Sequence, residues 1–196
     1  FTVHRLDLQT SGVICFAKTP EAHRDLSVQF QERRVQKLYH VIVEGSIPDE
    51  EGEIDKGIAP HKVIAGKMTI ANKGKKALTL YKVLERFKAY TYLEADIKTG
   101  RTHQIRLHFQ SIGHSLAVDK MYSKKTELFL SEIKVRKYRK DKMHEERPLM
   151  SRSSLHAFQL TVFHPSTRKS MTFEAPLPKD FRAVLNQLRK WGKKQL

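Results

Sequence analysis

The stretch VHRLDLQTSG at positions 3–12 sets His4, Arg5 and Asp7 close together and follows them with Thr10. Basic and acidic side chains this near one another are costly to bury unless they pair with each other or with a ligand. A carboxylate held in such a group can serve as a nucleophile. In a simpler interpretation, Asp7 only caps the turn that follows it. The stretch therefore offers Asp7 as a candidate nucleophile and leaves its structural role open.

A second polar cluster, GRTHQIR at positions 100–106, opens a predicted helix and supplies Arg101, His103, Gln104 and Arg106. An arginine beside a carboxylate favours the ionised form of that carboxylate. Arg106 can equally be an ordinary surface residue of its helix. Taken together, the two clusters provide a carboxylate and a cation that can meet across a cleft.

Other chemistries have little support in the sequence. The ten histidines are accompanied by no HExxH motif, no cysteine pair and no carboxylate cluster, so we expect no metal site. The glycine-lysine pairs near positions 66 and 74 lack the spacing of a phosphate-binding loop. The single cysteine, Cys15, excludes an internal disulfide and fits a reducing, cytoplasmic location.

The charge balance points to a polyanionic partner. The chain of 196 residues has 37 lysines and arginines against 21 acidic residues, a formal net charge of +16. A charge of this size attracts polyanions, and we place nucleic acid ahead of an acidic protein or a membrane surface. No apolar run is long enough for a membrane-spanning helix, so no membrane partner is expected.

Hydrophobic periodicity predicts an α+β domain built mainly on antiparallel strands. The predicted strands cover residues 2–5, 12–18, 37–43, 77–87, 90–97, 154–163 and 169–174. A first helix is expected after Thr19, which caps it, and a second over His103–Ser111, capped by Thr102. A last helix is expected to be capped by Asp180, and its apolar stripe consists of Phe181, Val184, Leu185 and Leu188. Residues 46–76 are expected to form hairpins and loops.

Residues 123–152 are dense in charged side chains and poor in large apolar ones. We interpret this segment as an insertion. Two interpretations stay open for it, contact with RNA phosphates and a mobile solvated loop.

The motifs resemble those of the RluA-type pseudouridine synthases. HRLDLQTSG is similar to the family signature HRLDxxTSG, and the strand KLYHVIVEG at 37–45 is similar to the family's KxYxAxVxG. TGRTHQIRLHFQSIGH at 99–114 resembles the third motif, and Asp119 with Tyr122 resembles the D-x-x-Y that follows. LHA at 155–157 and the later HP pair complete the resemblance, in the family's order.

The resemblance implies a pseudouridine synthase fold with flanking helices and a central RNA-binding cleft. It implies conversion of uridines in RNA to pseudouridine, with no metal and no organic cofactor. Asp7 matches the catalytic aspartate, Tyr39 the tyrosine that packs on the uracil, and Arg106 the basic residue that pairs with the aspartate. Arg5 matches the arginine that displaces the target base. We expect further RNA contacts from residues of the same motifs: His4, Thr10, Arg101, His103 and Gln104.

The expected chemistry agrees with these residue types. An aspartate with an ordinary pKa of about 3.9 is ionised at neutral pH. It can attack the ribose or the uracil ring, or assist departure of the base, and the sequence leaves the order open. Tyr39 offers a stacking face and a hydroxyl for proton transfer. Without the neighbouring motifs, a core tyrosine on a strand would be the preferred interpretation.

Two further expectations follow from the resemblance. Family members carry strands upstream of the first motif, and some carry a small RNA-binding domain there. We therefore interpret residues 1–196 as a catalytic domain that lacks its upstream strands. The expected substrate is large-subunit ribosomal RNA, with transfer RNA as the alternative, and we expect a monomer.

Two alternatives to this enzyme are an RNA-binding module without activity and a hydrolase that removes uracil. The presence of Asp7, Tyr39 and Arg106 together favours the enzyme over the inactive module. The resemblance argues against the hydrolase, because the family rejoins the base.

Overall fold

A computed structural model describes residues 1–134 and 145–192. Within these ranges the fold is built on a seven-stranded sheet in the order β1-β8-β2-β7-β6-β3, with β9 paired to β8, and a separate two-stranded sheet, β4-β5. All pairs are antiparallel except β1 with β8. The prediction of an α+β domain on a mainly antiparallel mixed sheet is confirmed.

The elements have the following bounds. The strands are β1 (Ser11–Gly12), β2 (Gln36–Glu44), β3 (Glu51–Asp55), β4 (Ile58–Pro60), β5 (Met68–Ile70), β6 (Leu78–Arg86), β7 (Tyr90–Ile97), β8 (Leu155–Phe163) and β9 (Ser170–Glu174). The helices are α1 (Pro20–Gln31), α2 (Gln104–Ser111), α3 (Leu130–Ile133) and α4 (Lys179–Trp191).

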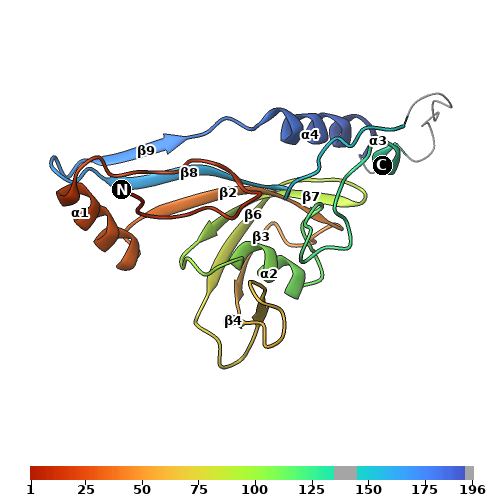
Figure 1. The fold of residues 1–196 in the computed structure, drawn as a ribbon. Helices are drawn as coiled ribbons and strands as arrows, with labels where there is room; N and C mark the ends of the chain where they lie inside the picture. The colour runs from red at the N-terminus through yellow and green to blue at the C-terminus, as the bar shows by residue number, and fades with distance from the viewer. Residues whose placement is uncertain (135–144, 193–196) are drawn as a thin grey trace.

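The central strands carry apolar residues on both faces, and a helix covers each face. Val41 and Val43 of β2 share a buried cluster with Ile105 and Phe109 of α2. Ile42, between them, belongs to the cluster that contains the apolar stripe of α4. This follows from the period of two along a strand, which sends alternate side chains to opposite faces. Figure 1 shows α2 and α4 on opposite sides of the sheet.

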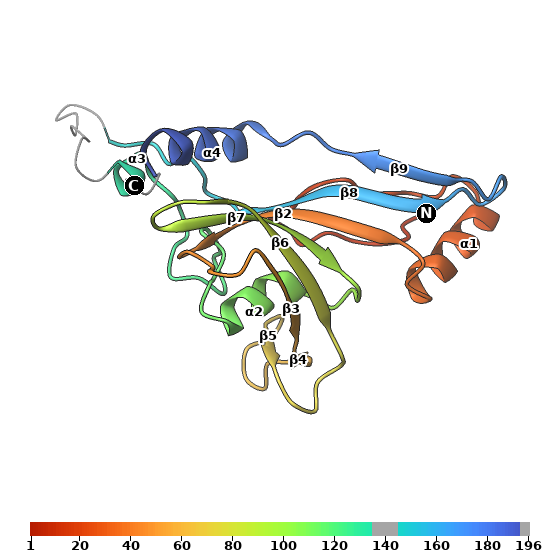
Figure 2. The same ribbon diagram turned by 180° about the vertical axis from the view of Figure 1, so that it is seen from behind.

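The remaining helices and the small sheet flank this core. Helix α1 packs through Leu26 against Leu160 and Val162 of β8. Residues of the N-terminal segment contact the same cluster. Figure 2 shows β4 and β5 beside α2, on the side of the sheet opposite α4. Ile58 and Leu107 join these elements in a buried cluster. Helix α1 and strand β8 therefore pack near the N-terminal segment, whereas the small sheet of β4 and β5 packs against α2.

The predicted strands at the beginning of the chain are wrong in extent. Residues 2–5 and 12–18 form one isolated bridge, between Thr2 and Phe16, and only β1 enters the sheet. Gly12, with a φ of 123° outside the extended region, is the last residue of β1. The backbone N–H of Cys15 donates to the His4 ring and not to a strand partner, and residues 3–10 lie in no strand.

We expect Gly12→Ala to destabilise the protein more than the matched change Gly66→Ala. A Cβ at position 12 would lie 2.1 Å from the carbonyl oxygen of Ala157, whereas one at Gly66 meets nothing within 4 Å. Both positions have a positive φ, which costs about 1–3 kcal/mol for a side-chain-bearing residue. Only Gly12 adds a backbone clash. Urea unfolding of both variants measures the difference, and equal losses would contradict this account.

Two predicted helix caps are also wrong. Thr102 does not cap α2, because His103 occupies the cap position with a left-handed backbone and Gln104 closes the preceding loop instead. Asp180 lies inside the first turn of α4, whose cap is Pro178. The Asp180 carboxylate pairs with Arg152. The cap by Thr19 on α1 is confirmed, with its hydroxyl accepting from Ala22 N at 3.2 Å.

The charged segment at 123–152 falls partly outside the described residues, since 135–144 are not described. The parts on either side contact the folded core. Leu128, Ile133 and Met150 are buried in the cluster that contains the apolar stripe of α4. Contact of this segment with RNA stays a prediction.

Candidate active site

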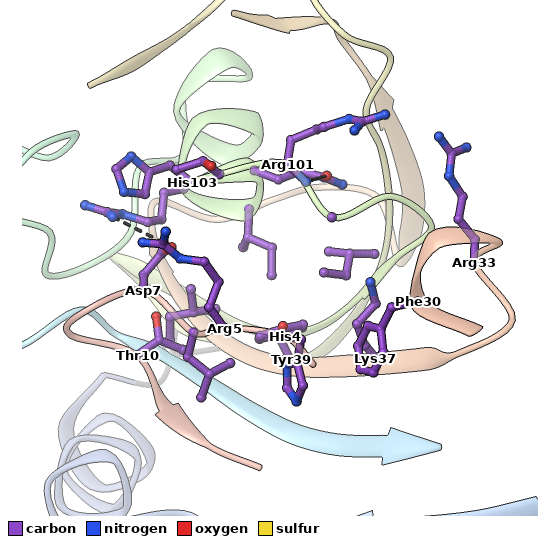
Figure 3. Close-up of a pocket in the computed structure, with 18 of the residues that line it drawn as sticks. His4, Arg5, Asp7, Thr10, Phe30, Arg33, Lys37, Tyr39, Arg101 and His103 are labelled. Atoms are coloured by element: carbon purple, nitrogen blue, oxygen red, sulfur yellow. Dashed lines mark hydrogen bonds and ion pairs between the residues drawn. The ribbon is translucent and has the colours of Figure 1, made fainter. Parts of the chain in front are cut away.

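The two polar clusters meet at a cavity of about 510 Å³. Its walls come from the N-terminal segment, the end of α1, the beginning of β2 and the loop that leads into α2. Figure 3 shows the labelled side chains of these elements arranged around a common space. Segments that are far apart in the sequence therefore form one site.

Asp7 and Arg106 form the ion pair that the sequence predicted. Arg106 Nη1 lies 3.3 Å from Asp7 Oδ2, across 99 positions of the chain. The Asp7 side chain is 21% exposed and the Arg106 side chain 9%. The carboxylate is therefore open to the cavity, while the guanidinium lies behind it. Burial disfavours the charge of Arg106, but the carboxylates of Asp119 and Asp7 outweigh burial and raise the pKa of the guanidinium.

A second carboxylate holds Arg106 from the other side. Arg106 Nε donates to Asp119 Oδ2 at 2.6 Å, and Nη2 donates to Oδ1 at 2.8 Å. The guanidinium carbon also lies 4.8 Å from the centre of the Tyr122 ring. The sequence matched Asp119 and Tyr122 to a family motif without assigning them a role. The structure places both around the same arginine.

Tyr39 lines the cavity from β2 and is half-buried. Burial raises the pKa of its phenol, and the negative charge of Asp7 raises it further. The phenol is therefore protonated at neutral pH and can donate a proton or a hydrogen bond. Its ring and the Asp7 carboxylate line the same space (Figure 3).

Arg5 and Arg101 add positive charge to the cavity. Arg5 is exposed, and Arg101 is half-buried with its Nε donating to the carbonyl oxygen of Lys76 at 3.1 Å. Both line the cavity (Figure 3). Their positions suit contact with a polyanion, and RNA contact by either residue stays a prediction.

His4 and Thr10 have partners or surroundings that point to positioning. His4 Nε2 accepts from the backbone N–H of Cys15 at 2.8 Å, and its ring stacks on Phe30. Burial, with Lys37 as the lesser cause, lowers the pKa of His4 to about 4, so the ring is neutral at pH 7. The Thr10 N–H donates to the Asp7 carbonyl at 2.9 Å and closes the turn. Among the described residues, the buried Thr10 hydroxyl oxygen has no hydrogen-bond partner.

His103 and Gln104 build the entrance to α2. His103 has φ 58° and ψ 21°, and its Nδ1 lies 2.7 Å from the Tyr122 hydroxyl. Burial is the main cause that lowers the pKa of His103. Gln104 is buried, and its amide donates to Leu78 O and Thr79 Oγ1. These bonds favour a structural role for Gln104, and its contact with RNA is untested.

Sequence reasoning did not select Lys37 or Arg33, which also line the cavity. Lys37 precedes Tyr39 by two residues on β2, so both side chains leave the same face of the strand. The bulge in the pairing of β2 with β8 places its extra residue on β8, which leaves this alternation intact. Strand periodicity would therefore have identified Lys37. Arg33 follows α1 with a positive φ of 59°, which no simple pattern predicts.

The described residues contain no group of three or more histidine, cysteine or acidic side chains that could hold a metal ion. Residues 1–134 and 145–192 also include no helix with the length and apolar character needed to cross a bilayer. A reaction without metal or organic cofactor stays an expectation.

Comparison with known proteins gives one consistent family. Residues 1–111 match the family described as RNA pseudouridylate synthase. The chain is 39% identical over 188 residues to ribosomal large subunit pseudouridine synthase D of Nitrosomonas europaea, covering 95% of this chain and 51% of the relative. It is 41% identical over 189 residues to the protein of that name from Pseudomonas aeruginosa, covering 95% and 56%. The chain thus spans about half the length of these curated relatives.

Solved structures agree with the fold. The human protein named RNA pseudouridylate synthase domain containing 1 aligns with a TM-score of 0.69 and 26% identity, over 98% of this chain and 81% of the human one. The human domain containing 4 protein aligns with a TM-score of 0.73 at 24% identity, over 96% and 75%. The second likeness speaks to the fold alone.

Proposed function

The chain belongs to the RNA pseudouridylate synthase family, and from that membership we propose that it isomerises specific uridines of structured RNA to pseudouridine. Large-subunit ribosomal RNA is the first substrate to test, because two relatives are named for it. Transfer RNA is the second. A monomer that acts in the cytoplasm stays our expectation.

One observation carries the proposal. Asp7 and Arg106, from opposite ends of the family match, form an ion pair at 3.3 Å in the wall of a cavity that Tyr39 also lines. The Asp7 carboxylate is reachable from the cavity and is paired with Arg106. An accessible carboxylate suits a reaction in which a base leaves ribose.

The first step of the proposed reaction is extrusion of the target uridine. A base inside an RNA helix has to leave its stack, at a cost of a few kcal/mol. Arg5 is exposed beside the cavity and can fill the space that the base vacates. Arg101 and Lys37 supply positive charge for the neighbouring phosphates.

The bonds then change in a balanced order. The bond between ribose C1′ and uracil N1 breaks with Asp7 as nucleophile or as a stabilising charge. The ring turns, and C1′ bonds to ring carbon five instead. The hydrogen on carbon five leaves as a proton, and N1 gains one, so the reaction is an isomerisation. Tyr39 is the group proposed to relay this proton: the phenol oxygen accepts it while the hydroxyl gives up its own proton, so the phenol ends the step protonated as it began.

We expect Tyr39→Phe to lower kcat by about 10²–10⁴-fold, the usual range for a proton-transfer group. The Phe ring keeps the stacking face, so RNA affinity should stay near the wild-type value. Tyr39→Leu removes the face as well and should weaken RNA binding further. Single-turnover rates and RNA-binding titrations separate the two effects. Full activity in Tyr39→Phe would exclude the hydroxyl from the proton transfer.

The experiment that tests the proposed function maps pseudouridine in bulk RNA from cells that lack the gene. We expect one or a few uridines to lose modification, and the full-length wild-type protein to restore them. The modified positions identify the substrate as ribosomal or transfer RNA. Loss of no site, together with retained RNA binding by the purified protein, would support the inactive RNA-binding module instead.

A further inference from the structure

Two residues hold the planar guanidinium of Arg106: one contacts an edge of the plane and the other lies against its face. One edge makes two bonds to Asp119, at 2.6 and 2.8 Å. One face lies over the Tyr122 ring at 4.8 Å. Nη1 is the nitrogen that contacts Asp7, at 3.3 Å. These contacts fix the plane of the guanidinium and aim Nη1 at Asp7.

Asp119 is itself fixed by the backbone. Its side chain is fully buried, and Oδ1 accepts from the N–H groups of Met121 at 2.8 Å and Tyr122 at 3.0 Å. Burial alone would raise the pKa of Asp119, but Arg106 and these N–H groups outweigh it and lower the pKa. Asp119 is thus a rigid and permanently charged support at neutral pH.

This arrangement limits the hydrogen bonds that Arg106 can donate to Asp7. An arginine facing one carboxylate favours two parallel bonds at about 2.7–2.9 Å, which would engage both carboxylate oxygens. Asp119 takes that two-bond arrangement, and Asp7 receives a single and longer contact. Asp7 is therefore oriented through Oδ2, while the Arg106 contact leaves Oδ1 free.

We propose that Asp119 is a positioning residue for the reaction, which holds Arg106 so that Asp7 is oriented and yet keeps one oxygen free to react. This inference rests on the proposed function. Asp119 is fully buried and does not line the cavity, so its effect passes through Arg106.

The test is Asp119→Asn in the full-length protein, assayed on the RNA that the wild type modifies. Without the Asp119 charge, Arg106 is free to pair with both oxygens of Asp7. We expect kcat to fall by about 100-fold, as for a displaced catalytic group, with KM within about threefold of wild type. A residue with a purely structural role would not lower kcat while it leaves KM unchanged.

Asp180→Asn is the matched control. Asp180 binds Arg152 with the same two distances, 2.6 and 2.8 Å, and neither residue lines the cavity. Its variant should keep the wild-type kcat and KM. If Asp119→Asn behaves like this control, the positioning inference is overturned while the proposed function stands.

A second measurement does not depend on the folding of Asp119→Asn or on activity. Nitrogen-15 spectra of the arginine Nε–H groups are recorded for the wild type and for Asp7→Asn. If Asp119 holds Arg106, the Arg106 Nε–H stays protected from solvent exchange in both proteins. Loss of protection in Asp7→Asn would show that Asp7 is the holder and would overturn the inference. A wild type that modifies no RNA would refute the proposed function alone.

Discussion

Asp7→Asn is expected to lower pseudouridine formation by at least about 10⁴-fold, a loss typical of removing a catalytic carboxylate or nucleophile. Asparagine has almost the same shape, and its carbonyl oxygen can still accept from Arg106 Nη1. The change therefore removes the negative charge and the nucleophile while the site keeps its geometry. The release of hydrogen from carbon five of labelled uridine measures the rate in a single turnover.

The stability and the RNA affinity of Asp7→Asn should stay close to the wild-type values. Arg106 keeps its two bonds to Asp119 in the variant, so no buried charge loses its main partner. Asp25→Asn is the matched control, since Asp25 pairs with Arg168 and lies outside the cavity. A rate for Asp7→Asn within tenfold of this control would exclude Asp7 as the nucleophile.

The central strands could be predicted because their apolar residues obey a local rule. The segments 37–43 and 90–97 alternate or run apolar over strand lengths, and both are strands in the structure. The stripe of α4 follows a period of 3.6 and is buried as predicted. Local periodicity decides these elements because each carries enough apolar area to pack on a neighbour.

The predictions that were wrong concern elements whose structure depends on a single backbone angle or on a hydrogen-bond partner elsewhere in the loop. Gly12, with a φ of 123°, ends the short strand β1, and the backbone N–H of Cys15 donates to the His4 ring. Gln104 reaches back to Thr99 and replaces the expected cap by Thr102. Neither effect leaves a periodic trace in the sequence, since each depends on the contacts of one folded loop.

The candidate site shows the same division. The pairing of Asp7 with Arg106 was expected from the family resemblance and from the chemistry of a buried carboxylate, and it is present at 3.3 Å. Spacing alone could not pair residues 99 positions apart. The ion pair of Asp119 with Arg106 could not be predicted, because in a sequence a carboxylate that positions another side chain cannot be told from any other acidic residue.

Arg106→Met is expected to be the most destabilising of the changes considered, with a loss of about 3–5 kcal/mol in the free energy of unfolding at pH 7. Methionine fills a similar volume but leaves Asp119 as an unpaired carboxylate with no solvent exposure. Arg152→Met is the matched control, because its pair with Asp180 is 22% and 30% exposed and water can replace the lost partner. We expect the control to lose less than half as much in urea unfolding.

The pH dependence of the loss in unfolding free energy distinguishes a buried charge without a partner from a packing defect. In the wild type the pKa of Asp119 is lowered, so its contribution to stability is present above the ordinary pKa of about 3.9 and is lost as the pH falls through the lower folded value. In Arg106→Met the guanidinium no longer opposes burial, and the pKa of Asp119 rises. The free-energy cost of the buried Asp119 charge in the variant is largest at neutral pH. It decreases as the pH falls, because Asp119 then takes up a proton. The difference in unfolding free energy between wild type and variant should therefore narrow as the pH falls from neutral towards the ordinary carboxylate pKa of about 3.9. A loss that is constant over this range would mean that the introduced methionine disturbs packing and that Asp119 finds another partner.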